Sequence, residues 1–175
     1  APEIITADIP WGVTSGAISH DRKQIAFTTN EGGTSRVYLL NTRTREYRRV
    51  DVIPTGIASD LTFSPDDGRL AMTLNTTQSP RDVFVLDLGQ EPLAHGGLTR
   101  WTQSEVGGLD VSTFSVPELI HYPTFDLSGD AKREIPAWIY KPAGKGPHPV
   151  VISIHGGPEG QARPAFNSTY QMWIG

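Results

Sequence analysis

Two stretches of this sequence share one pattern: "GAISHDRKQIAFTTNEGGTSRVYLLNT", from Gly16 to Thr42, and "DLTFSPDDGRLAMTLNTTQSPRDVFVLDL", from Asp60 to Leu88. Four pairs of matching residues lie 45 positions apart: Ser19 and Ser64, Asp21 and Asp66, Ile25 and Leu70, Ala26 and Ala71. One inserted residue explains why two later pairs lie 46 apart, Val37 with Val83 and Leu40 with Leu86. Repeats of about 40 to 50 residues made of short strands are typical of β-propeller blades.

The strands of the repeat are expected within "QIAFTT", "RVYLLN" and "VFVLDL", which are rich in β-branched and aromatic residues. In the turn "SPDDG", Pro65 presets φ and Gly68 can take a positive φ. Several strands are apolar on both faces, as expected where each sheet packs between two others. The chain holds about two blades, whereas a closed propeller needs about four to eight, so we expect an incomplete ring.

The pairs Ser19/Asp21 and Ser64/Asp66 have two possible interpretations. They could be fragments of a catalytic site, or they could form turns through side-chain hydrogen bonds to the backbone. Because they recur at the same place in each repeat, we favour the turn.

The periodicity ends near residue 102, and residues 103–118 are rich in Gly and Ser. We therefore divide the chain into residues 1–113, propeller blades, and residues 114–175, a linker followed by the start of a second domain. In that second part, strands are expected at "LIHYPTFD" and "IPAWIYKP", with a turn at Gly129 between them. "VVISIH", residues 150–155, is predicted to be a strand buried on both faces, and a helix capped by Asn167 or Ser168 follows.

This order of strands, glycine loop and helix is how an α/β-hydrolase domain begins. The loop reads His155, Gly156, Gly157, Pro158. Glycine lets a backbone N–H come close to a reacting carbonyl, and Pro158 has no N–H and stiffens the exit. The loop is either a plain connection or one half of an oxyanion hole, and the motif alone leaves both open.

Propeller repeats followed directly by a hydrolase start resemble the prolyl oligopeptidase family of serine peptidases, which includes acylaminoacyl and dipeptidyl peptidases. The resemblance rests on "FSPDDGRLAM" and, more specifically, on "IPAWIYKPAGKGPHPVVISIHGGPEGQARPAFNSTYQMW". It implies that residues 1–113 are the C-terminal part of a propeller and residues 114–175 the N-terminal part of the peptidase domain. It also implies that the Gly157 N–H is an oxyanion donor and that His155 is not the triad base. We interpret His155 as a residue that orients the loop by hydrogen bonds. A Tyr stands at the position of His155 in the prolyl oligopeptidase and dipeptidyl peptidase branches, so the chain is more similar to the acylaminoacyl branch.

The chain departs from the family because it contains no G-x-S-x-G, and it therefore supplies no nucleophile and no triad. The resemblance implies a parent that hydrolyses short peptides, which the propeller admits, through a Ser-Asp-His triad located downstream. This chain alone is predicted to be inactive and to need the rest of its parent. Two alternatives remain, a propeller-bearing esterase and a non-catalytic TolB-like binding propeller with a hydrolase remnant. Glu159 and Arg163 are candidate substrate-binding residues, or they contact the propeller or each other.

The composition narrows the function classes. The 175 residues are 37% hydrophobic and 19% charged, enough to bury a core, and the net charge of −4 argues against a nucleic-acid partner. There are no cysteines, which excludes disulfides and thiolate metal sites, and the histidines lack ligand spacing, so we expect no metal and no cofactor. No apolar run is long enough to span a membrane. The cytoplasm and the periplasm both remain open, as does a homo-oligomer.

Overall fold

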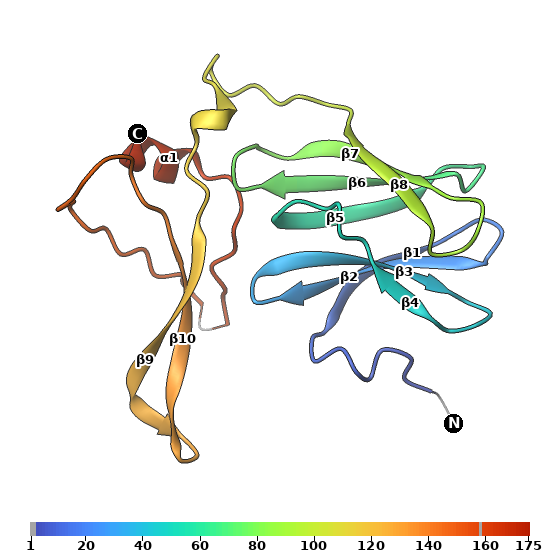
Figure 1. Cartoon of the computed structure of the whole chain (residues 1–175), viewed down its shortest axis with the longest axis horizontal. Helices are drawn as coiled ribbons and strands as arrows, with labels where there is room; N and C mark the ends of the chain where they lie inside the picture. The colour runs from blue at the N-terminus through green and yellow to red at the C-terminus, as the bar shows by residue number, and fades with distance from the viewer. Residues whose placement is uncertain (1–2, 158) are drawn as a thin grey trace.

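The computed structural model describes residues 3–157 and 159–175. Its first half consists of two four-stranded antiparallel sheets that lie one above the other (Figure 1). The first sheet contains β1 (Val13–Ile18), β2 (Gln24–Glu31), β3 (Thr34–Asn41) and β4 (Tyr47–Arg49). The second contains β5 (Gly56–Phe63), β6 (Arg69–Thr76), β7 (Asp82–Leu88) and β8 (His95–Arg100).

The second half is mostly extended. After a short 3₁₀ turn (Val111–Thr113), β9 (Glu118–Ser128) and β10 (Ala131–Ile139) form a long two-stranded hairpin that projects beside the sheets (Figure 1). The chain then runs without strands to the helix α1 (Ser168–Ile174). In the described part of the chain, no helix is long and apolar enough to cross a membrane.

The register of the two sheets confirms the sequence repeat. Ile25 pairs with Leu40 across β2 and β3, and the equivalent Leu70 pairs with Leu86 across β6 and β7. The inserted residue lies in the longer β6–β7 loop, as the change in spacing from 45 to 46 indicates. The two sheets are thus structural copies, and both match a propeller-like arrangement of four antiparallel strands.

The Ser-x-Asp pairs form turns, as predicted. Ser19 Oγ donates to Asp21 Oδ1 at 2.8 Å and accepts from Gln24 N at 2.9 Å. In the second sheet, Ser64 Oγ donates to Asp66 Oδ1 at 2.6 Å and accepts from the equivalent backbone N–H at 3.0 Å. Each serine therefore closes the turn that joins the first two strands of its sheet.

The core lies between the two sheets. β5 packs on β1, β2 and β3, and residues from both sheets interdigitate there. The buried cluster contains Ala26, Val37, Leu39, Val50, Ile53, Ala58, Phe63, Leu70, Met72, Leu74 and Leu86. The first sheet is also covered on its other face, where Phe27 stacks on Tyr38 at a centroid distance of 5.1 Å.

Several predictions for the second half are confirmed. β9 contains the expected segment 119–126, and β10 contains residues 135–139 of the expected segment 135–142 but begins earlier, at Ala131. Gly129, with φ of +65°, lies in the turn between them. The helix begins where expected, because Asn167 Oδ1 accepts the backbone N–H of Tyr170 at 3.1 Å as its N-cap.

The prediction of a buried strand at residues 150–155 is wrong for this structure. The segment has no strand pairing, and its apolar side chains are open, with Val150, Ile152 and Ile154 each at least 80% exposed. A buried strand needs neighbours on both edges and both faces, and among the described residues β9 and β10 pair only with each other. The described residues accordingly contain no parallel sheet, so the expected α/β-hydrolase start remains a prediction.

Candidate functional site

The glycine loop forms a compact, exposed turn. A Cβ placed on Gly157 would come within 2.6 Å of Glu159 N, and one on Gly160 would collide with Gly156 O and lie 2.7 Å from His155 Nδ1. Neither glycine has a positive φ, so the turn requires them for close approach and not for a left-handed backbone. Pro158, the expected stiffening residue, lies outside the described residues.

The turn leaves a backbone donor available. Among the described residues, no acceptor is bonded to the N–H of Gly157, and Gly157 is exposed. The ring of His155 lies against the same turn, with Nδ1 at 3.0 Å from Gly156 O. An open backbone N–H is chemically able to stabilise a developing negative oxygen, the role expected for Gly157.

The two candidate substrate-binding residues lie in different surroundings. Glu159 is exposed, and in the described residues it is not paired with Arg163. Arg163 instead points to the turn between β2 and β3, where Nε donates to Gly33 O at 2.8 Å and Nη2 to Ser35 Oγ at 3.1 Å. Burial lowers the pKa of Arg163 below its ordinary value, but a guanidinium remains protonated.

The segment after the glycine turn is held by both sheets. Asn30, at the end of β2, donates its side-chain amide to Gln161 Oε1 at 2.8 Å. Asn75, the equivalent residue of β6 and 45 positions later, accepts the backbone N–H of Phe166 at 3.1 Å. Residues 161–166 thus lie across the ends of two repeats and use the same side chain of each.

The helix is attached separately. Gln171 is buried, donates to Ser115 O at 3.0 Å and accepts from Ser115 N at 2.8 Å. Phe166 packs on Phe114 at a ring-centroid distance of 5.6 Å. The linker and the C-terminal segment are therefore joined to each other as well as to the sheets.

The sequence analysis missed the contacts made by Asn30, Gly33, Ser35 and Asn75. The sequence does mark two of these residues, because Asn30 and Asn75 have the same 45-residue spacing as the turn residues. An Asn at the end of a strand is ordinarily a turn former, so nothing in the spacing distinguished a docking residue.

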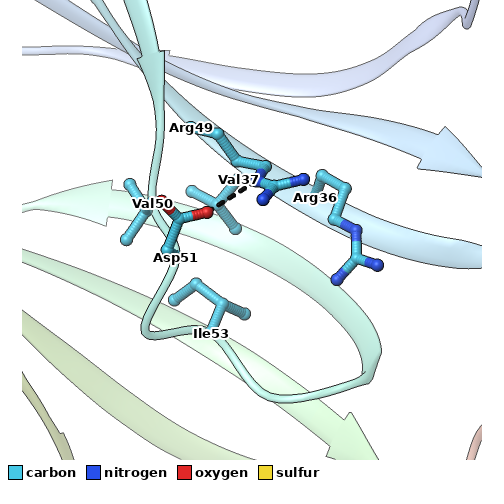
Figure 2. A pocket seen from close by; sticks show the side chains of 6 residues that line it. All are labelled: Arg36, Val37, Arg49, Val50, Asp51 and Ile53. Carbon is cyan, nitrogen blue, oxygen red and sulfur yellow. Dashed lines mark hydrogen bonds and ion pairs between the residues drawn. The ribbon is translucent and has the colours of Figure 1, made fainter.

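A small cavity of about 90 Å³ opens beside β3 and β4, lined by Arg36, Val37, Arg49, Val50, Asp51 and Ile53 (Figure 2). Arg49 Nε donates to Asp51 Oδ1 at 2.7 Å, and the Arg36 side chain lies next to that of Arg49 (Figure 2). The volume is well below the ~300 Å³ at which ligand pockets begin, so it cannot take a peptide. Within residues 3–157 and 159–175, no cluster of His, Asp and Glu has the composition of a metal site.

Of the comparisons with known proteins, only the one with solved structures bears on the fold. No family model matches the sequence. No curated protein matches it either. Among solved structures, a chain from a structural and mechanistic study of two prolyl endopeptidases is similar over 94% of this chain, with a TM-score of 0.68 and 17% identity.

Two structures of prolyl oligopeptidase B from Galerina marginata, bound to a 35-residue hydrolysis and macrocyclization substrate, are also similar. They cover 74% and 75% of this chain, with TM-scores of 0.55 and 0.56 and identities of 16% and 15%. This chain spans 23% of the first structure and 17% of the other two. The similarity shows that the chain has the fold of one part of a prolyl oligopeptidase.

Proposed function

We propose that this chain is the junction of a serine peptidase of the prolyl oligopeptidase kind, which hydrolyses short peptides of the acylaminoacyl, dipeptidyl or oligopeptidyl type. In this proposal the two sheets are the last blades of a propeller that limits access to the active site. The glycine turn supplies one oxyanion donor, the N–H of Gly157, and His155 orients the turn. The Ser-Asp-His triad belongs to another part of the parent.

The proposal is carried by one observation: the fold similarity spans 94% of the chain, which is more than the two four-stranded sheets, whose last strand ends at Arg100. The exposed N–H of Gly157 adds support, because an oxyanion donor must be free of protein acceptors. Glu159 is kept as a candidate substrate contact, since its side chain is exposed beside the turn.

The exposed apolar surfaces support the presence of further parts of the parent. Val150–Ile154 and the outer face of the second sheet, with Val83 and Trp101, leave apolar side chains in water. Such surfaces are ordinarily covered by neighbouring elements of the same protein. We therefore propose that the remainder of the parent chain covers them.

The test is Gly157→Pro in the full-length protein. Removing the N–H should lower kcat by about 10²- to 10³-fold and change KM much less, because the donor acts mainly on the transition state. Gly97→Ala is the control, since a Cβ at Gly97 meets nothing within 4 Å. A folded Gly157→Pro protein with full kcat would exclude the oxyanion role.

A fluorophosphonate probe separates the alternatives. It should label one serine of the full-length protein, outside this chain, and leave the 175-residue chain unlabelled. A full-length protein that resists labelling would favour the non-catalytic binding propeller. Comparison of peptide and simple ester substrates distinguishes the peptidase from the esterase.

A further inference from the structure

The segment that follows the glycine turn is bonded to the sheets within a few residues. Arg163 donates to Gly33 O at 2.8 Å and to Ser35 Oγ at 3.1 Å, and Ser35 is buried. Pro164, the next residue, is fully buried. This part of the chain is therefore fixed in place, whereas residues 150–157 are exposed.

The turn between β2 and β3 lies in close contact with residues 161–163 at Gly33. Gly33 has a φ of +94°, and a Cβ there would lie 3.2 Å from Ala162 O and 3.3 Å from Trp138 Nε1. Any side chain at Gly33 would therefore push residues 161–163 away from the turn. Asn30 holds both parts, because its Oδ1 accepts from Gly33 N at 3.1 Å and its Nδ2 donates to Gln161.

The fixed segment, residues 161–164, begins only a few residues after Gly157, which carries the candidate donor N–H. Between Gly157 and Gln161 there are three residues, and the last of them, Gly160, abuts Gly156 O and the ring of His155. Gly160 directly precedes Gln161, so a displacement of Gln161 acts on the residue that lies against Gly156 and His155.

We propose that Arg163 is a positioning residue, which fixes the donor turn on the propeller through Gly33 and Ser35 with the help of Asn30 and Asn75. The orientation of the oxyanion donor is then set by the blades and not by the hydrolase segment alone. Its effect on turnover rests on the proposed function, but the effect on the order of residues 161–166 does not. Arg163 bonds the sheet in this role and does not touch the substrate.

The experiment uses the full-length protein and two variants of Arg163. Arg163→Met removes the donors and keeps an unbranched stem, and Arg163→Lys keeps the charge but loses the guanidinium fork. Arg43→Met is the control, because Arg43 is exposed and its side chain makes no hydrogen bond among the described residues. Amide hydrogen exchange of residues 161–166 is measured together with kcat and KM on a short peptide p-nitroanilide.

We expect Arg163→Met to speed exchange at Ala165 and Phe166, whose N–H groups are bonded to Arg163 O and to Asn75 Oδ1. It should also lower kcat by about tenfold or more, with KM changed less than about threefold. Arg163→Lys should recover part of both effects, and Arg43→Met should change neither. Unchanged exchange in Arg163→Met would overturn the inference, whatever happens to kcat. If Arg163→Met does not fold, Gln161→Ala is the second variant. It removes the hydrogen bond from Asn30 to the same segment, at an exposed side chain, and should give a weaker change of the same sign.

The outcome also separates this inference from the proposed function. Faster exchange with full kcat would support the clamp and count against an oxyanion role for the turn. A loss of kcat in Gly157→Pro, with no change of exchange or kcat in Arg163→Met, would support the oxyanion role and overturn the clamp.

Discussion

The two four-stranded sheets are copies in sequence and in register, yet they differ in what covers them. Val37 in β3 is completely buried, whereas its repeat counterpart Val83 in β7 is 37% exposed. Val37 faces the second sheet, and Val83 faces outward into a shallow apolar hollow of about 270 Å³ that Trp101 also lines. The comparison shows that the repeat specifies which residues are apolar, while burial depends on whether a neighbouring sheet is present.

The same comparison applies to charged positions. Asp82 in β7 occupies the place that Arg36 has in β3, 46 positions earlier. Its carboxylate is fully buried and accepts hydrogen bonds from Ser79, Arg100, Thr102 and Ser104. In the described part of the chain, Arg36 Nε is buried without a hydrogen-bond partner, and its ion-pair partner, Glu31 Oε2, lies 4.0 Å away. One copy of the position is therefore a satisfied polar centre, and the other is not.

The largest expected effect comes from placing a lysine at each of the matched valines. Val37→Lys puts an unpaired charge into the core and should cost several kcal/mol, about enough to unfold a typical domain. Val83→Lys should be tolerated in the 175-residue chain and should reduce its self-association, because the charge stays in water. Circular dichroism on heating and light scattering measure the two effects. Equal loss of structure in both variants would contradict the comparison, and loss at Val83 only in the longer protein would show that a further element covers it.

A smaller effect is expected from the polar pair. Asp82→Asn should lower the free energy of unfolding by about 3–5 kcal/mol, because it leaves Arg100 without its buried partner. Arg36→Met, which keeps the stem, should change it by less than about 1 kcal/mol, since it removes an unbonded nitrogen. Urea unfolding of the two variants gives the difference. A costly Arg36→Met would show that the long ion pair between Arg36 and Glu31 stabilises the fold.

Asp82 also predicts a pH dependence. Burial acts to raise the pKa of Asp82, but the hydrogen bonds from Thr102, Arg100 and Ser104 outweigh it and hold the pKa below the ordinary value. A carboxyl whose pKa is lower in the folded state stabilises the fold above its unfolded pKa, and that stabilisation is lost as the pH falls through the folded pKa. Stability should therefore decline below about pH 4, and Asp82→Asn should flatten this decline. An unchanged acid slope in Asp82→Asn would assign the decline to other carboxylates.

The smallest difference is expected at the turn serines. Ser19→Ala and Ser64→Ala each remove the acceptor for a backbone N–H, and each should cost about 1 kcal/mol, with the larger loss at the buried Ser19. Thermal unfolding of the two variants measures it. A loss at only one of them would show that the two turns have diverged in energy despite their common geometry.

The sequence was sufficient to predict features that depend on local chemistry. The two sheets, the Ser19 and Ser64 turns, the β9–β10 hairpin and the Asn167 cap all follow from spacing, turn residues and strand composition. Residues 150–155 show where this ends, because an apolar run becomes a buried strand only through pairing with distant segments. The docking roles of Asn30 and Asn75 were missed for the same reason, since their partners lie 131 and 91 residues away.

The contact between the two turns has a consequence for the order of the repeats. Asp67, with a φ of +56°, reaches from the second sheet to the first and accepts the backbone N–H groups of His20 and Asp21, each at 2.8 Å. The residue equivalent to Asp67 in the first repeat is Arg22, and the residue equivalent to His20 in the second is Pro65, which has no N–H.

Two tandem copies of the first repeat would therefore bring a guanidinium donor against backbone donors. Two copies of the second would lose one of the two N–H groups. The two repeats have the same fold, but neither can replace the other at this turn. Their succession along the chain is directional, and a tandem array or a circular permutation that reverses it would have to rebuild this one turn.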